Sequence, residues 1–393
     1  MNVMKLGILG GLVASTALLG TLSSSATATD AEPWENAAVL PLDDDDGPAV
    51  VGKYSSVALD HLGRASISYY DSTNHDLKLA VCNDEQCSEP TIVTVDDNGA
   101  TGQYTSMTLG LEGYPVISYF DYDVGALKLA VCDTRHCGNP TITTIDSYID
   151  GGWVGWYSSV TLDGNVPMIA YHSFTSSAVK VAACDDKFCD HASLTTIDHA
   201  LGADPSIAMG SSAPIVAYFD TDAGLKVATC DDATCAHPTI NTIEKAGEHG
   251  WFTSLALDQD GHPVISYYDT DARELRLAMC TDAACDNARI VAFDTGDAAG
   301  TYTSVAVDHD NHPVISFHDA DNGSLLVARC TSPMCRTHEI IEVDDGNVGS
   351  HTSLAVDGPR TVISYHDENE GSLKLASRSI AIEPFSVTVV DAG

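Results

Sequence analysis

Short runs of apolar residues, bounded by Gly, Pro, Asn and Asp, fill the chain from about residue 50 to its end. Runs of this length and composition are typical of β-strands. One group of four strands is expected at residues 254–258, 263–268, 275–279 and 290–293, and the next at 304–308, 313–317, 325–328 and 339–343. No segment shows the 3.6-residue period of an amphipathic helix, so the pattern predicts an all-β protein.

The four-strand pattern recurs around one phrase, S-Y-Y-D, which occurs in seven copies. The copies begin at Ser68, Ser118, Ala170, Ala217, Ser266, Ser316 and Ser364, at intervals of 47 to 52 residues. A unit of about 50 residues is too small to bury a core alone, and repetition at that period indicates a closed array. We therefore predict a seven-bladed β-propeller of four-stranded antiparallel blades over residues 48–393.

The repeat also resembles a known kind of propeller blade. The runs at 304–308 (SVAVD) and 313–319 (PVISFHD) are similar to the first two strands of NHL-type blades. The likeness is one of pattern over about 340 residues, and it implies a fold and a strand order but no activity. The S-x-D-x-G-x-T-W box of sialidase propellers is absent, so no glycosidase site is expected from it.

Two segments could complete the seventh blade. Residues 38–43 resemble an outer strand that precedes the first unit, and residues 386–391 resemble one that follows the last. We expect the acidic N-terminal segment 29–47 to take part in closing the ring. Its run of four aspartates at 43–46 is simplest as a solvated linker.

Residues 1–28 have the features of a signal peptide. Lys5 supplies a positive start, residues 6–22 are apolar without charges, and Ala26-Thr27-Ala28 offers small residues at a cleavage point. The sequence therefore predicts an exported protein, extracellular or periplasmic, without integral membrane association.

The net charge of the chain limits which classes of partner it can bind. Eighteen basic and 56 acidic side chains give a formal net charge of −38. Such a charge disfavours binding to nucleic acid or to anionic membranes. It is compatible with a cationic partner, with cation binding, or simply with solubility.

All twelve cysteines occur in C-x4-C pairs at the end of a predicted third strand. The pairs are Cys82 with Cys87, Cys132 with Cys137, Cys184 with Cys189, Cys230 with Cys235, Cys280 with Cys285, and Cys330 with Cys335. An even count in an exported chain favours disulfides, and one pair per blade cannot supply the four ligands of a structural zinc site. The seventh unit has Arg378 in place of the first cysteine and carries no pair.

Two sets of loops should share one face of the propeller, the channel-mouth face. The loops into each first strand carry G-x-Y-x-S, and the second-to-third-strand loops begin at the last residue of S-Y-x-D, so tyrosines and carboxylates should ring the channel mouth. The alternative is that the repeated Gly, Ser and Asp only build turns. Candidate ligand-binding residues are Tyr54, Tyr104, Tyr157, Trp153, Trp156, Asp204, Trp251 and Tyr302.

Histidines break the repeat at the third position of S-Y-x-D and at one ring tyrosine. These candidate catalytic residues are His172, His318, His351 and His366. With neighbouring carboxylates they could bind a transition metal or transfer protons, or they could replace aromatics in packing. Units six and seven are neighbours, so His318, His351 and His366 could cluster with the carboxylates Asp319 and Asp367 as candidate metal ligands. Turns of the form D-x-D-x-G, such as the one that contains Asp319 and Asp321, offer oxygens for calcium or are plain polar hairpins.

Three functions remain open from sequence. The first is a secreted protein that binds a glycan, peptide or protein at the channel mouth through aromatics and carboxylates. The second is an extracellular polysaccharide lyase or hydrolase that uses His, Tyr and Asp at the mouth, with or without a metal. The third is a structural or surface-array protein. The sequence contains no standard catalytic motif that would favour the enzyme hypothesis.

Overall fold

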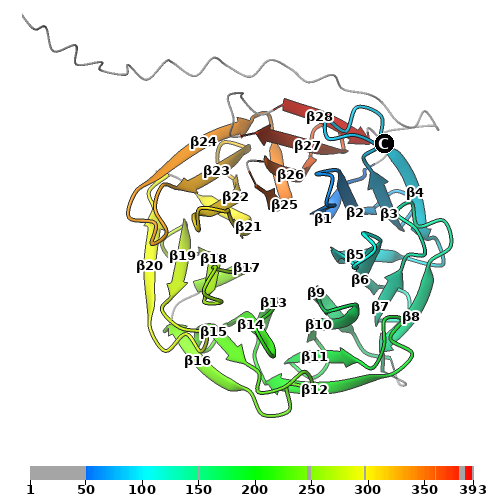
Figure 1. Cartoon of the computed structure of the whole chain (residues 1–393), viewed down its shortest axis with the longest axis horizontal. Helices are drawn as coiled ribbons and strands as arrows, with labels where there is room; N and C mark the ends of the chain where they lie inside the picture. The colour runs from blue at the N-terminus through cyan, green and yellow to red at the C-terminus, as the bar shows by residue number, and fades with distance from the viewer. Residues whose placement is uncertain are drawn as a thin grey trace, which may run out of the picture. The chain divides into compact units, whose positions relative to one another are not determined.

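The computed structural model describes residues 50–148, 151–245, 249–295, 298–358, 360–379 and 386–391, and it confirms the all-β prediction. Seven antiparallel sheets, each of four strands consecutive in the chain, are arranged around a central axis (Figure 1). We number these blades 1 to 7 in chain order. No helix in the described part of the chain is long and apolar enough to cross a membrane. The predicted signal peptide and the segment 29–47 lie outside the described residues.

Within each blade the strands run outward from the axis in sequence order (Figure 1). The innermost strands are β1 (Lys53–Leu59), β5 (Thr101–Leu109), β9 (Val154–Asp163), β13 (Gly202–Met209), β17 (His249–Leu257), β21 (Ala299–Val307) and β25 (Val348–Asp357). The second strands are β2 (Ala65–Asp71), β6 (Pro115–Asp121), β10 (Val166–Ser173), β14 (Pro214–Asp220), β18 (Pro263–Asp269), β22 (Pro313–Asp319) and β26 (Arg360–Asp367). The third strands are β3 (Asp76–Val81), β7 (Ala126–Val131), β11 (Ala178–Cys184), β15 (Gly224–Thr229), β19 (Glu274–Cys280), β23 (Ser324–Cys330) and β27 (Ser372–Ser379). The outer strands are β4 (Thr91–Asp96), β8 (Thr141–Asp146), β12 (Ala192–Asp198), β16 (Thr239–Glu244), β20 (Ala288–Phe293), β24 (His338–Asp344) and β28 (Ser386–Asp391).

The innermost strands begin earlier than predicted. β17 starts at His249 instead of residue 254, so the G-x-Y-x-S segment belongs to the strand and our assignment of it to a loop was wrong. The reason is a bulge: Gly250 and Phe252 have φ of 119° and 57°, and the register with β18 shifts twice while pairing continues. Glycine followed closely by an aromatic looks like a turn in sequence, but here it bends a strand.

The C-terminal strand β28 pairs with β27 and supplies the fourth strand of blade 7. The seam between blades 7 and 1 is held by side chains: the Tyr69 hydroxyl donates to Asp391 Oδ2 at 2.9 Å, and Arg360 donates to the carbonyls of Gly63 and Glu85. Whether residues 29–47 add to this closure lies outside the described residues.

The hydrophobic core is divided into seven clusters, one between each pair of adjacent blades. Between blades 1 and 2, for example, Leu79 and Ile117 are fully buried. The cluster at each of six interfaces also includes the disulfide of its later blade. The bridges therefore add buried apolar surface where blades meet.

The six predicted disulfides are all present. They join Cys82 with Cys87, Cys132 with Cys137, Cys184 with Cys189, Cys230 with Cys235, Cys280 with Cys285, and Cys330 with Cys335. The first cysteine of each pair ends the third strand or directly follows it, as predicted.

The second cysteine of each pair lies in the turn toward the fourth strand. These residues are Cys87, Cys137, Cys189, Cys235, Cys285 and Cys335, all buried and all with φ between 44° and 56°. Each donates its backbone N–H to the carbonyl three residues earlier, at 2.9–3.3 Å. A tight turn with its last residue in the left-handed region brings the two sulfurs together, so each bridge closes this turn within its own blade.

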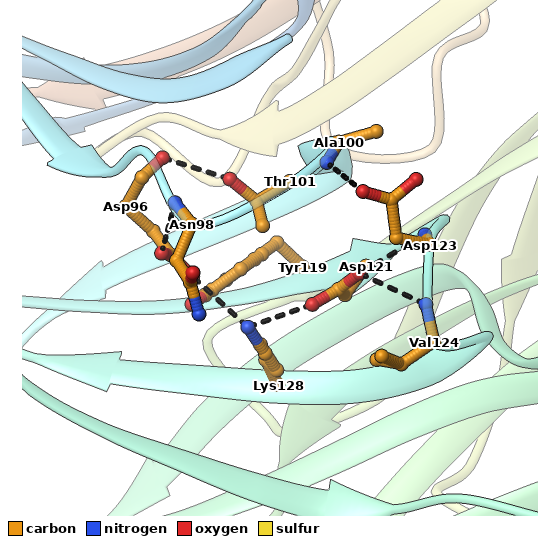
Figure 2. Close-up of polar contacts among 9 residues, drawn as sticks. All are labelled: Asp96, Asn98, Ala100, Thr101, Tyr119, Asp121, Asp123, Val124 and Lys128. Atoms are coloured by element: carbon orange, nitrogen blue, oxygen red, sulfur yellow. Dashed lines mark hydrogen bonds and ion pairs between the residues drawn. The ribbon is translucent and has the colours of Figure 1, made fainter.

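A buried polar network joins the outer parts of neighbouring blades (Figure 2). Between blades 1 and 2, Asp96 Oδ2 accepts from the Tyr119 hydroxyl at 2.6 Å and lies 3.2 Å from Lys128 Nζ. The same ammonium lies 2.7 Å from Asp121 Oδ2. Burial opposes the charged form of Lys128, but hydrogen bonds and charge from Asp121 and Asp96 outweigh it and raise its pKa.

The tyrosine–carboxylate bond of this network recurs at five other interfaces. The pairs are Tyr69–Asp391, Tyr171–Asp146, Tyr218–Asp198, Tyr267–Glu244 and Tyr365–Asp344. Between blades 5 and 6 the equivalent positions are Phe293, Phe317 and Leu326, which pack in one apolar cluster. Polar and apolar solutions to the same interface therefore coexist in one chain.

Candidate functional site on the channel-mouth face

Six of the seven innermost strands approach the axis through a segment whose glycine, and the ring residue two positions later, both have positive φ. In blade 2, Gly102 has φ 101° and Tyr104 has φ 53°. A Cβ on Gly102 would lie 2.8 Å from Leu77 Cα in blade 1, so the close approach of two backbones requires glycine there. A left-handed conformation costs a bulky residue such as Tyr104 about 1–2 kcal/mol. A large side chain is kept at this position despite that cost, which points to a role for the side chain itself.

Seven such residues, one per blade, form what we call the axial belt. Its members are Tyr54, Tyr104, Tyr157, Asp204, Phe252, Tyr302 and His351, all with φ between 34° and 57°. Neighbouring rings have centroids 4.5–4.6 Å apart and planes inclined by 47–59°. Sevenfold rotation turns neighbouring planes by about 51°, so the side chains follow the symmetry of the backbone. Asp204 alone replaces a ring with a carboxylate.

A circle of serines adjoins the belt and links every blade to the next. Ser56 Oγ accepts the backbone N–H of Met107 at 3.0 Å, and equivalent bonds follow around the ring. The other six run from Val160 to Ser106, Ile207 to Ser159, Leu255 to Ser206, Val305 to Ser254, Leu354 to Ser304 and Val57 to Ser353. These serines therefore have a structural role, but they join one blade to the next and do not bond an adjacent turn as the sequence suggested.

A second set of hydroxyls connects the innermost strand of one blade to the S-Y-x-D serine of the preceding blade. Ser68 Oγ lies 2.8 Å from Thr105 Oγ1, for example. Equivalent contacts are Ser118–Ser158, Ser266–Thr303, Ser316–Thr352 and Ser364–Ser55. Ala170 faces Pro205, which has no hydroxyl. Opposite Ala217 the threonine is kept, and Thr253 donates to Gly250 O instead. Losses in the repeat are thus compensated by their neighbours.

The belt and the two hydroxyl layers line an open cavity of about 260 Å³. Tyr54, Tyr104, Tyr157, Asp204 and Tyr302 all line it, so five of the predicted ligand-binding residues come together. Small-molecule pockets usually measure about 300–1,000 Å³, so this cavity accepts a group the size of one side chain.

Asp204 is the carboxylate among the lining residues and dominates the electrostatics of the cavity. Burial raises its pKa to about 6, opposed by the hydrogen bond that its Oδ2 accepts from Phe252 N at 2.9 Å. Burial, with the charge of Asp204, also raises the pKa of Tyr157 to about 12. Burial lowers the pKa of His351 to about 3. At neutral pH the cavity therefore presents one carboxylate among neutral phenols and a neutral imidazole.

Aromatic side chains continue outward from the belt to the exposed rim of blades 2 and 3. Trp156 stacks on Tyr104 at 5.6 Å, and Trp153 stacks on Trp156 at 5.5 Å. Tyr122 lies 5.5 Å from Trp153, and Phe174 lies 5.2 Å from Trp156. Trp153, Tyr122 and Phe174 are 37%, 47% and 56% exposed. We call Tyr122, Trp153, Trp156 and Phe174 the aromatic platform.

The sequence had singled out the two tryptophans of the platform but not Tyr122 or Phe174. A signal was present: the residue after S-Y-x-D is aromatic only in units two and three, and is Ser, Thr, Ala or Glu elsewhere. The third predicted tryptophan, Trp251, lies outside the platform and packs 5.2 Å from Phe219.

The S-Y-x-D carboxylates do not ring the channel mouth, so that part of our expectation was wrong. Asp121 is 2% exposed; its Oδ1 accepts the N–H groups of Asp123 and Val124, and its Oδ2 pairs with Lys128 (Figure 2). Five of the six aspartates at this position satisfy backbone donors and a cation in this way, whereas Asp319 bonds the side chain of Asn322 in place of a cation.

Of the four candidate catalytic histidines, His318 and His351 pack against the same ring, that of Tyr302, with centroids 6.1 and 4.5 Å from it. The charges of His366 and His318 add to burial in lowering the pKa of His351, so these three lie near one another, whereas His172 belongs to blade 3. The ring of His351 lies between Tyr54 and Tyr302 in the belt, whereas His366 Nδ1 lies 2.7 Å from Val51 O at the ring seam. His318 Nδ1 lies 3.2 Å from Thr301 Oγ1 within blade 6.

Burial lowers the pKa of all four histidines, to about 4 at His172. A lowered pKa keeps an imidazole neutral at pH 7, which makes it a poor general acid and a weaker general base.

The three predicted metal ligands already have protein partners. Asp319 Oδ1 accepts from the N–H of Asp321, Asp321 pairs with Arg273 at 3.0 Å, and Asp367 lies 2.6 Å from Lys374. Among the described residues, the group whose ligand atoms lie close enough for one ion is a different one, Asp258, Asp260 and His262. It lies on the β17–β18 hairpin, and calcium binding stays a prediction.

No protein-family model and no curated protein matches the chain. Solved structures do match. A structure from an analysis of two prolyl endopeptidases is 9% identical, with a TM-score of 0.55, and the alignment covers 87% of this chain and 50% of that one. A puromycin hydrolase S511A mutant complexed with PGG is 10% identical, with a TM-score of 0.57, covering 89% and 54%. A structure of puromycin hydrolase itself is 12% identical, with a TM-score of 0.55, and the alignment covers 86% of this chain and 55% of that one.

These similarities concern the fold alone. The chain spans about half the length of the solved chains, and identity near 10% carries no site or activity across. They agree with the propeller that the repeat predicted. The likeness to NHL-type blades stays a likeness of pattern.

Proposed function

We propose that this is an exported binding protein that recognises a glycan, peptide or protein ligand on its channel-mouth face. The observation that carries the proposal is the continuous aromatic surface from the axial cavity, through Tyr104 and Trp156, to the exposed rings of Trp153 and Phe174. Aromatic side chains give large contact area for little loss of entropy, and they are enriched where proteins bind.

Export is supported by the leader-like residues 1–28 together with six disulfides, because such bridges form and persist in oxidising compartments. The lyase or hydrolase hypothesis receives less support, because burial lowers the pKa values of the histidines, His351 packs between two aromatic rings, and His366 bonds to a backbone carbonyl at the ring seam. The structural-array hypothesis does not account for aromatics that stay exposed at one sector of one face.

The proposal is tested by selection against two libraries, a glycan array and a displayed random-peptide library, with the purified protein immobilised. Ligands selected by the native protein should lose affinity for Trp153→Ala and for Phe174→Ala. They should bind normally to Tyr114→Ala, a partly exposed aromatic on the β5–β6 hairpin of the opposite face. Selection of no ligand from either library, or ligands indifferent to both mouth-face variants, would show that this face is not the binding surface.

A further inference from the structure

The chemistry around the aromatic platform narrows the ligand class. Exposed large apolar side chains elsewhere on the described surface, such as Leu62, Leu111 and Ile340, stand on other hairpins or outer strands. Those of the platform instead touch one another and join the belt. A contiguous exposed patch of this kind marks a contact surface.

Charge near the platform is of one sign. In the described parts of the loops that frame it, at 97–100, 122–125, 151–153, 174–177, 199–201 and 221–223, the charged side chains are Asp97, Asp123 and Asp222, with no Lys or Arg. All three are exposed. The whole chain carries −38. An aromatic face attracts cations, and flanking carboxylates with a strongly negative protein reinforce that attraction.

Sugar recognition would require polar groups beside the rings with hydrogen-bonding capacity directed at hydroxyls. Here the neighbouring groups bond to their own or an adjacent loop. Thr175 Oγ1 accepts the N–H of Trp153 at 2.8 Å, and Ser176 Oγ donates to Ser173 Oγ at 2.7 Å. Asp123 Oδ2 accepts the N–H of Ala100 at 3.1 Å, while its charge remains at the surface. The π faces and the negative charge are what the platform offers a ligand.

The platform is also continuous with a second anionic position. Trp156 stacks on Tyr104, Tyr104 lies 4.5 Å from Tyr157, and the charge of Asp204 raises the pKa of Tyr157. The axial cavity of about 260 Å³ at Asp204 accepts a group of side-chain size. A ligand with several cationic groups along a flexible chain suits this arrangement better than a single small ion.

We propose that the aromatic platform binds the cationic side chains of a basic peptide segment, with guanidinium or ammonium groups over Trp153 and Phe174 beside Asp123. This inference rests on the proposed binding function and specifies its ligand class. Arginine suits it best, because a planar guanidinium stacks on aromatic faces.

The test titrates full-length protein with tetra-arginine, tetra-lysine, tetra-serine and tetra-glutamate peptides, followed by calorimetry and tryptophan fluorescence. Tetra-arginine should bind, tetra-lysine more weakly, and the other two should not. Affinity should fall as NaCl is raised from about 20 to about 300 mM, since exposed charges are screened. Trp153→Leu and Phe174→Leu, which keep apolar bulk but remove the π face, should each weaken binding about 3- to 10-fold. Asp123→Asn should do so by a smaller factor.

Matched controls stand on the opposite face. Tyr114→Leu and Glu112→Gln, both on the β5–β6 hairpin, should bind tetra-arginine like the native protein. If Trp153→Leu does not fold, Phe174→Leu carries the test, because its ring is 56% exposed. Equal binding of tetra-serine, or unchanged affinity in both leucine variants, would overturn the inference. A neutral oligosaccharide bound at the platform in place of the peptides would overturn it and leave the binding function standing. If no ligand binds at this face, both the basic-peptide inference and the proposed binding function are refuted.

Discussion

The polar network between blades 1 and 2 allows a quantitative prediction, because the chain contains its own apolar version of the same interface. Asp96 and Asp121 are 5% and 2% exposed, and Lys128 lies between them. The variant Lys128→Met leaves two buried carboxylates facing an uncharged side chain. Removing one member of a buried ionic group costs about 3–5 kcal/mol of unfolding free energy. For about 340 ordered residues this corresponds to a Tm lower by roughly 4–7 °C.

Replacing the whole network should have little effect. Asp96→Phe, Tyr119→Phe and Lys128→Leu copy Phe293, Phe317 and Leu326 of the interface between blades 5 and 6. Val124→Asn is added to these three substitutions because Asp319, in blade 6, accepts a 2.9 Å bond from Asn322 Nδ2 where blade 2 has a lysine. Buried ion groups exchanged for well-packed apolar residues are often neutral or stabilising by about 1–4 kcal/mol. This fourfold variant should therefore melt within about 2 °C of the native protein, or above it.

The assay is scanning calorimetry at pH 7 with the disulfides intact. The exposed Lys187→Met serves as a control for loss of charge alone and should leave Tm unchanged. A fourfold variant as unstable as Lys128→Met would refute the equivalence of the two interfaces. An unchanged Tm for Lys128→Met would show that the ionic network contributes nothing net.

Three further outcomes are expected. Ser353→Ala at the ring seam should lower the unfolding free energy by about 1–3 kcal/mol, since it leaves the Val57 N–H without its acceptor. Chemical denaturation should show a similar loss for Ser106→Ala, whose bond lies inside the ring. If only the seam variant had no effect, ring closure would not depend on this bond. The pKa of Asp204 is raised from 3.8 to about 6, so the stability that its protonated form provides is lost as the pH rises from about 4 to 6. Asp204→Asn should therefore be more stable than the native protein at pH 8, by up to about 3 kcal/mol, but not at pH 3.5. Equal stability of the two proteins at pH 8 would contradict the raised pKa. Treatment with EDTA should leave Tm unchanged, because the candidate calcium carboxylates already pair with protein donors, and a lower Tm restored by calcium would reverse that expectation.

The architecture was predictable because repetition averages out local ambiguity. Four weak strand signals become decisive when they recur seven times at one spacing, and the cysteine pairs fall at the same point of six copies. The exact limits of the innermost strands were not predictable. A residue such as Tyr104 at φ 53° is set by packing around the axis and not by local preference, so its segment looks like a turn.

The position of the S-Y-x-D carboxylates was mispredicted because their partner is far along the sequence. A cation stands in the middle of six third strands, among leucines and valines, and a buried lysine such as Lys128 requires an acceptor. Leu326 replaces it in the one blade whose Phe317 also lacks a hydroxyl. This covariation between repeats indicates that the tyrosine and the cation belong to one network. It could have been used to predict that the aspartates lie at the blade interfaces and not at the channel mouth.

Departures from the repeat fall into two kinds, and the difference between them separates scaffold from function. Some are compensated: Ala170 faces Pro205, and Phe317 packs with Phe293, so a lost polar group is matched by a lost partner. Tyr122 and Phe174 are different, because they add aromatic rings to the surface that remain about half exposed. Folding gains little from rings left in water, so their retention is best explained by a ligand that covers them. The uncompensated departures therefore locate the binding face in blades 2 and 3, where the platform variants test it.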